Sequence, residues 1–226
     1  MTQTRKKTTT TGRVAWVAGA TGLVGRHLIE QLSSHPDYSD IIAFVRKQSD
    51  ANWLALPKVR QHIVDYNALN APSDHNTVDD LFCALGTTKA KTPDPDQYYT
   101  IDVTYPLNFA ELGLTQGAQC YAVVSAHGAN KNSFSSYLKM KGELELKLQL
   151  LSYPHLVIAR PGLLKGDRGE FRPLERMSEY VTNLLPGNLR SIHARDVAAS
   201  LIRNTLCAET NVVQLASKTM QGAFGQ

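Results

Sequence analysis

The fold can be inferred from the stretch Val17-Ala18-Gly19-Ala20-Thr21-Gly22-Leu23-Val24-Gly25. It follows an apolar run typical of a strand and opens an amphipathic run typical of a helix. Glycines in the spacing GxxGxxG let the chain turn tightly, and a helix N-terminus offers free N–H groups to a pyrophosphate. The stretch therefore predicts a dinucleotide-binding turn. A tight strand-to-helix turn without a ligand is the alternative.

Apolar runs rich in β-forming residues alternate with amphipathic runs along the rest of the chain. The predicted strands are Val14–Ala18, Ile41–Val45, Val59–Val64, Asp80–Leu85, Cys120–Ser125, His155–Ile158 and Val212–Ala216. The predicted helices are Leu23–Ser33, Tyr99–Thr115, Phe134–Leu151, Leu174–Leu184 and Ala194–Leu206. Strands that alternate with helices pair in parallel through right-handed crossovers. We therefore expect an α/β doubly wound parallel sheet, a Rossmann fold, in one domain over 13–226 with a small substrate-side region at its C-terminal end.

The segments between these elements are polar. The stretch Lys89–Gln97 is predicted to be a loop, as is Lys165–Pro173, which is also the best candidate for a mobile lid. Residues 1–12 are predicted to form a flexible tail because no apolar stretch accompanies their basic residues.

Composition narrows the functional class. The 226 residues carry a formal net charge of only +4, so we expect no nucleic-acid partner. No run approaches 18 apolar residues, so no membrane helix is expected. Three cysteines without CxxC spacing favour a reducing, cytoplasmic location, and the absence of ligand spacing such as HExxH predicts no metal site.

The end of the second predicted strand indicates which dinucleotide is bound. Sites for NAD carry a carboxylate there, which hydrogen-bonds the ribose 2′-hydroxyl. This chain instead has Arg46 and Lys47, and its first carboxylate is Asp50. A guanidinium matches a 2′-phosphate in charge and geometry, so NADPH is favoured over NADH. Solubility alone is the other explanation for these exposed basic residues.

Other predicted cofactor contacts follow later strands. Asp65 is placed to contact adenine, or else is a turn residue. Gly86 would let the backbone pass close to the cofactor ribose, and Arg160-Pro161-Gly162 would approach the nicotinamide or simply punctuate the chain. The predicted cofactor-binding residues are Gly19, Thr21, Gly22, Leu23, Val24, Gly25, Arg46, Lys47, Asp65, Leu85, Gly86, Thr87, Thr88, Arg160, Pro161 and Gly162.

Three residues in the middle of the chain predict the chemistry. Ser125 ends the fifth predicted strand, and Tyr137 and Lys141 stand four apart on the following helix, so they share one face. A phenol with a pKa near 10 becomes a useful acid or base when an ammonium stabilises its phenolate. We predict that Tyr137 gives its proton to a carbonyl oxygen that Ser125 also hydrogen-bonds. A solvated helix face is the alternative.

These motifs together resemble the short-chain dehydrogenase/reductase superfamily, specifically its atypical, epimerase-like members, over nearly the whole chain. The stretches Leu85-Gly86-Thr87-Thr88-Lys89-Ala90-Lys91, Ser125-Ala126-His127-Gly128-Ala129 and Arg160-Pro161-Gly162-Leu163-Leu164 look like those of the small oxidoreductases related to the mammalian Tat-interacting tumour suppressor. The resemblance implies NADPH binding with Ser125, Tyr137 and Lys141 at the active site, and a homodimer by family habit. Asp102 departs from the superfamily, which often has an asparagine there that holds a proton-relay water.

The leading hypothesis is an NADPH-dependent oxidoreductase that reduces a small carbonyl substrate. Asp196 is read as structural at a helix N-terminus, and His193 as a residue of the pocket wall or a bystander. An NADPH-binding redox sensor with little turnover is the first alternative. A nucleotide-sugar epimerase or dehydratase is the second, disfavoured because only some sixty residues follow Arg160-Pro161.

Overall fold

The computed structural model describes residues 12–73, 77–165, 191–207 and 212–225. The helix expected over Leu174–Leu184 lies outside these ranges. So do the predicted tail, apart from Gly12, and the candidate lid, apart from Lys165.

A seven-stranded sheet forms the centre of the molecule, with all six neighbouring pairs of strands parallel. Its order is β3-β2-β1-β4-β5-β6-β9. The strands are β1 (Arg13–Ala18), β2 (Tyr38–Val45), β3 (Val59–Ile63), β4 (Asp80–Cys83), β5 (Cys120–Val124), β6 (His155–Arg160) and β9 (Val212–Ala216). The strand order switches between β1 and β4, because β2 and β3 lie on one side of β1 and the later strands lie on the other. Open α/β sheets bind ligands at the carboxyl ends of the strands at such a switch point.

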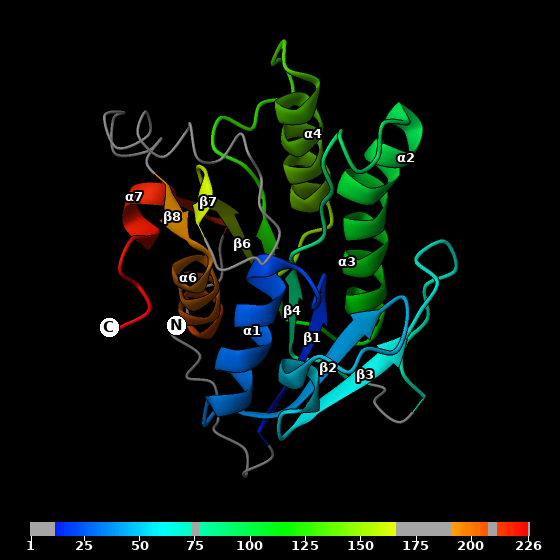
Figure 1. Cartoon of the computed structure of the whole chain (residues 1–226), viewed down its shortest axis with the longest axis vertical. Helices are drawn as coiled ribbons and strands as arrows, with labels where there is room; N and C mark the ends of the chain where they lie inside the picture. Colours follow the sequence, from blue (N-terminus) through cyan, green and yellow to red (C-terminus); the bar gives the residue numbers. More distant parts are fainter. Residues whose placement is uncertain (1–11, 74–76, 166–190, 208–211, 226) are drawn as a thin grey trace, which may run out of the picture.

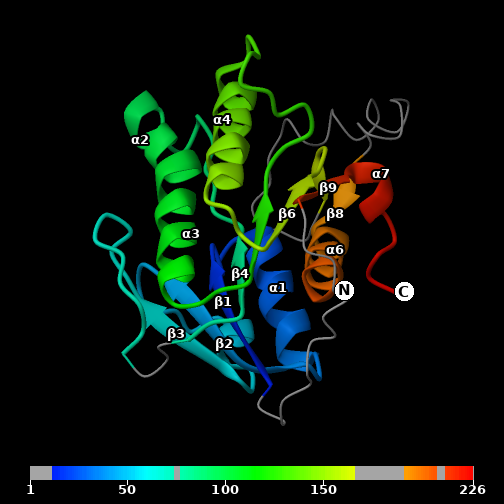
Figure 2. The same ribbon diagram turned by 180° about the vertical axis from the view of Figure 1, so that it is seen from behind.

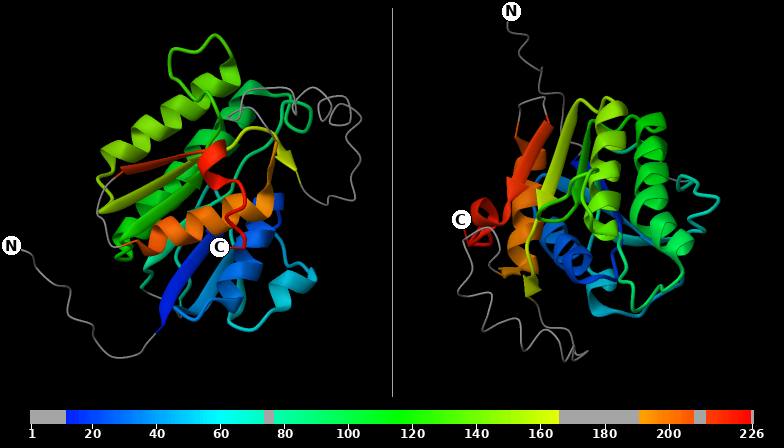
Figure 3. Two further views of the ribbon diagram at one scale, coloured as in Figure 1. Left: turned by 90° about the vertical axis from the view of Figure 1, so that its left-hand side faces the viewer. Right: turned by 90° about the horizontal axis from the view of Figure 1, so that it is seen from above.

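Helices cover both faces of this sheet (Figures 1 and 2). One face carries α1 (Leu23–Ser34) and α6 (Ala194–Leu206), and the other carries α3 (Tyr105–Thr115) and α4 (Ser136–Leu150), as the view from above in Figure 3 shows. Shorter elements are η1 (Asn52–Ala55), α2 (Pro95–Tyr99), the π-helical turn η2 (Thr100–Thr104) and α7 (Ser217–Met220). Two short strands, β7 (Leu164–Lys165) and β8 (Ile192–His193), pair in parallel beside them.

Burial on both faces explains the uninterrupted apolar strands. Along β1, Ala15 and Val17 pack into the core under α1 and α6, whereas Trp16 and Ala18 pack into the core under α3 and α4. All four are fully buried, because successive side chains of a strand point to opposite faces. The predicted Rossmann fold and single α/β domain are confirmed.

Several boundaries differ from expectation. The strand β4 ends at Cys83 instead of Leu85, while β2 begins at Tyr38 and β6 runs on to Arg160. The loop predicted over Lys89–Gln97 was drawn too long, because Pro95 starts a helix and the Asp94 side chain caps it by accepting a hydrogen bond from the Asp96 N–H at 3.1 Å. The helix expected from Tyr99 is therefore the continuous run α2, η2 and α3. The short elements η1, β7, β8 and α7 were not predicted.

Asp196 lies in the first turn of α6 and accepts the N–H of Phe224 at 3.1 Å, so its structural reading is confirmed. Among the described residues no helix is long and apolar enough to cross a bilayer.

Candidate active site and cofactor site

The glycine turn is built by contacts that leave no room for side chains. Gly19 has a φ of +80°, and a Cβ there would lie 2.5 Å from the carbonyl oxygen of Ala84 in the loop after β4. A Cβ on Gly25 would lie 2.0 Å from the Gly19 carbonyl oxygen. The N–H of Gly22 donates to that oxygen at 2.9 Å and closes the turn. The turn thus packs against the loop of β4 at the switch point, as a dinucleotide cradle requires.

The first turn of α1 fits an anionic ligand. The N-cap residue, Gly22, has no side chain that could accept hydrogen bonds from the N–H groups of this turn, and the turn contains no acidic residue. A phosphate placed there would meet these N–H groups and the positive end of the helix dipole. The residues present therefore fit the pyrophosphate of a dinucleotide.

An indole braces this turn in a way that the sequence did not suggest. Trp53 on η1 donates its ring N–H to the Ala20 carbonyl at 3.2 Å, and the guanidinium of Arg26 lies 4.9 Å from the centre of its ring. A tryptophan in the loop after the second strand was the available signal. The sequence does not show its contact with the glycine turn, because Trp53 and Ala20 are 33 residues apart along the chain.

The end of β2 carries the predicted basic residues. Arg46 and Lys47 follow Val45 directly and are exposed at the carboxyl edge. Arg46 lies near enough to Tyr66 to act on the pKa of that phenol, which burial nevertheless raises. Asp65 accepts hydrogen bonds from both the backbone and side-chain amides of Asn67, at 2.9 and 3.0 Å, so its turn role is present.

A buried ion pair lies beside the loop after β4. Lys141 on α4 holds its Nζ 2.9 Å from Oδ1 of Asp102, which comes from the π turn η2. The other carboxylate oxygen of Asp102 accepts the Thr87 N–H at 2.9 Å. A Cβ on Gly86 would lie 3.5 Å from Asp102 Oδ1 and 3.9 Å from Lys141 Nζ. The predicted residues Gly86, Thr87 and Lys141 therefore meet, and Asp102 joins them.

Tyr137 lies one helical turn before Lys141 on α4, with 37% of its surface exposed. Burial raises the pKa of its phenol, the ammonium of Lys141 lowers it and the carboxylate of Asp102 raises it, and the net direction is upward. The predicted action of Lys141 on the phenol is therefore present, but Asp102 opposes it. The sequence singled out Asp102 as a departure without showing this contact.

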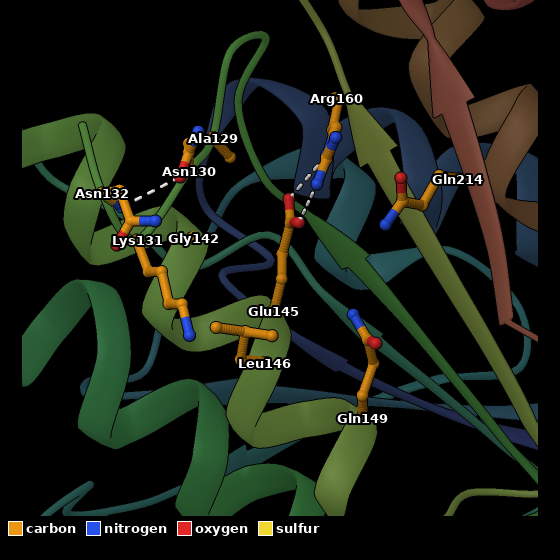
Figure 4. A pocket seen from close by; sticks show the side chains of 10 residues that line it. All are labelled: Ala129, Asn130, Lys131, Asn132, Gly142, Glu145, Leu146, Gln149, Arg160 and Gln214. Atoms are coloured by element: carbon orange, nitrogen blue, oxygen red, sulfur yellow. Dashed lines mark hydrogen bonds and ion pairs between the residues drawn. The ribbon is translucent and has the colours of Figure 1, made fainter.

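Ser125 has a partner that was not predicted. Its hydroxyl donates to Oε1 of Glu145, which also accepts the Nε of Arg160 at 2.9 Å, and Arg160 pairs with Oε2 through Nη2. Glu145 lies one further turn along the helix face that holds Tyr137 and Lys141, so the same spacing of four residues could have revealed it. Glu145 and Arg160 face each other in Figure 4. Together with Asn130, Gln149 and Gln214 they line a pocket of about 320 Å³.

This network bears on two predictions. The guanidinium of Arg160 pairs with Glu145, so this side chain has a structural role. The Ser125 N–H donates to the carbonyl of Ala159 on β6 at 2.7 Å, and the His127 N–H donates to the carbonyl of Pro161, just after β6, at 2.8 Å. The Gly162 N–H donates to the Ser217 hydroxyl at 2.6 Å. The role of Ser125 toward a substrate stays a prediction, as do contacts of Thr21, Leu23, Val24, Leu85 and Thr88 with a cofactor.

Comparison with known proteins agrees with this geometry. A family model described as the NAD-dependent epimerase/dehydratase family matches residues 15–138, more than half of the chain. The chain belongs to this family. It is 31% identical to Protein HTATIP2 of Rattus norvegicus over 207 residues, which cover 91% of this chain and 84% of that protein. It is 32% identical to Protein fmp52-1, mitochondrial, of Aspergillus terreus over 168 residues, 72% of each chain.

A solved structure shows the same fold. The 3-oxoacyl-[acyl-carrier protein] reductase from Brucella melitensis, in complex with NAD, superposes with a TM-score of 0.69 at 16% identity, over 94% of this chain and 98% of that one. The family model and the relative HTATIP2 confirm the predicted resemblance to atypical, epimerase-like short-chain dehydrogenases/reductases. This member of the epimerase/dehydratase family is an NAD(P)-binding, oxidoreductase-like enzyme. The cytoplasmic location stays a prediction, and the Aspergillus terreus relative is named mitochondrial.

Proposed function

We propose that this enzyme is an NADPH-dependent reductase of a small carbonyl compound, with Tyr137 as the proton donor. One observation carries the proposal. Lys141 shares a helix face with Tyr137 and lies close to Gly86, and Gly86 belongs to the loop after β4 that packs on the glycine turn. The proton donor and the cofactor cradle thereby share the carboxyl edge of the sheet, where such ligands bind.

Each residue has a defined task in this proposal. NADPH, when held by the glycine turn and the loop after β4, would supply the hydride that the carbonyl carbon takes up. The phenol of Tyr137 breaks its O–H bond and gives the proton to the carbonyl oxygen as the C=O π bond is lost. Ser125 turns its hydroxyl from Glu145 to donate a hydrogen bond to the same oxygen. Solvent then returns a proton to the tyrosine.

NADPH is the proposed cofactor because Arg46 and Lys47 stand exposed where a 2′-phosphate would lie. A homodimer is part of the same proposal by family resemblance. A cytoplasmic location is proposed from the three cysteines without CxxC spacing. A redox sensor with little turnover is the second candidate, and the bond between Ser125 and Glu145 favours it because this bond occupies the hydroxyl that the reaction needs.

The test measures oxidation of NADPH and NADH by the purified protein with a panel of aldehydes, ketones and quinones. We expect turnover with NADPH and a loss of at least about 100-fold in Tyr137→Phe, since positioned proton donors contribute on that order. Tyr99→Phe is the matched control. The Tyr99 hydroxyl accepts a hydrogen bond from Lys147 at 3.1 Å, and Lys147 lies about three helical turns beyond Tyr137 on α4. Tight NADPH binding without turnover on any compound would support the sensor instead.

A further inference from the structure

The ion pair of Asp102 and Lys141 is enclosed by three elements. Asp102 comes from η2, Lys141 from α4, and Thr87 and Gly86 from the loop after β4. The side chains of Asp102 and Lys141 are 1% and 4% exposed. A buried carboxylate without a partner would be costly, and here the Lys141 ammonium and the Thr87 N–H are its partners.

The π turn sets the direction of Asp102. A π turn inserts one residue into the α-helical register and so rotates the residues before it by about 100° relative to α3. Asp102 is the third of the five residues Thr100–Thr104 in that turn. A local irregularity in an otherwise continuous helix therefore delivers this carboxylate to Lys141.

The surrounding groups define the charge that Tyr137 meets. The groups that act on Lys141 are Asp102, Tyr137 and Cys83, and each of them raises the pKa of the ammonium, which burial lowers. Tyr98 on α2 also senses both Asp102 and Tyr137, and burial with these neighbours raises its pKa to about 12. Lys141 is thus held in its charged form, yet its charge is neutralised at 2.9 Å by a carboxylate.

We propose that Asp102 is a positioning residue that neutralises Lys141 and thereby keeps Tyr137 a protonated phenol at neutral and mildly alkaline pH. A lone ammonium would stabilise the phenolate, whereas an ion pair presents a dipole whose field largely cancels at the phenol. A phenol that holds its proton can donate it to a carbonyl but cannot accept one from an alcohol. The site is therefore biased toward reduction. This inference rests on the proposed function, in which Tyr137 is the proton donor.

The test is a titration of Tyr137 in the full chain without cofactor or substrate. Tyrosines carry ¹³C at the ring carbon that bears the hydroxyl, and the NMR resonance of Tyr137 is identified by its absence in Tyr137→Phe. We expect a wild-type pKa above the ordinary value near 10. We expect Asp102→Asn to lower it by about one unit or more, since a charge within a few ångströms commonly has this effect.

Matched variants separate charge from folding. Asp96→Asn removes the same charge from the exposed first turn of α2 and should leave the pKa of Tyr137 unchanged. Asp102→Glu restores the charge and should return the pKa toward the wild-type value. A wild-type Tyr137 that titrates below its ordinary value, a measurement that needs no variant, overturns the proposal. An Asp102→Asn pKa equal to that of wild type does the same.

Activity supplies a second readout. In the variant Asp102→Asn the alcohol-oxidation limb of the pH–rate profile should move to lower pH by the same interval as the pKa of Tyr137. A parallel loss of rate at every pH, with no displacement of the profile, overturns the inference. If the wild-type protein turns over no compound, the proposed function fails, and the titration still decides whether Asp102 controls the proton of Tyr137.

Discussion

Substitution of Gly25 by alanine tests the packing of α1 against the glycine turn. The new Cβ would lie 2.0 Å from the Gly19 carbonyl oxygen and 2.9 Å from the Cα of Ala20, both backbone atoms that no rotamer change can move. The helix would have to move more than 1 Å to restore an ordinary contact. Such overpacking costs up to about 3 kcal/mol. Alanine returns about 1 kcal/mol of helix propensity, so we expect a net loss of about 2 kcal/mol.

The assay is thermal unfolding followed by circular dichroism, with Gly22→Ala as the matched control. A loss of about 2 kcal/mol corresponds to a Tm decrease of roughly 4–8 °C in a domain of this size. At Gly22 the nearest atom to a new Cβ is the same oxygen, at 3.2 Å, so this variant should lose under about 1 kcal/mol. Equal Tm values for Gly25→Ala and wild type would refute the reasoning, as would equal losses in the two variants.

Two further substitutions test the cofactor edge and the network behind the site. Arg46→Asp should weaken NADPH binding by about 10- to 100-fold while sparing NADH, because a charge-assisted contact with the 2′-phosphate is lost; calorimetric titration checks this against Lys218→Asp on α7, and equal losses for both dinucleotides would contradict it. Glu145→Gln should lower the free energy of unfolding by about 2 kcal/mol, because the buried carboxylate that binds Arg160 loses its charge; urea denaturation beside Glu143→Gln measures it, and identical midpoints would disprove it.

Local patterns in the sequence were sufficient for the fold and for part of the site. The strand β9 and the helix α6 have the predicted boundaries, because the pattern of apolar residues marks both ends of each element. The pair Tyr137 and Lys141 could be placed on one face because helical spacing depends only on nearby residues. The glycine turn was likewise recognisable because its strand, glycines and helix are contiguous.

Other features could not be predicted, because a contact between distant segments or a cap decides them. Pro95 looked like a loop residue, but the Asp94 cap makes it the first residue of α2. The sequence marked Asp102 only as a departure from the superfamily, and the π turn brings it to a lysine 39 positions away. The hydrogen bond from the Ser125 hydroxyl to Glu145 was not predicted, and the role of Ser125 toward a substrate stays a prediction.

The amino-acid sequence alone was enough to establish a parallel α/β sheet, a dinucleotide turn and a tyrosine–lysine pair on one helix face. Each of these depends on residues within a few positions of one another, where backbone propensity and side-chain periodicity act. Only the tertiary structure shows that Asp102 pairs with Lys141 and that Glu145 accepts hydrogen bonds from both Ser125 and Arg160. Those contacts join separate elements, and buried charges find their partners only when the sheet brings the elements together.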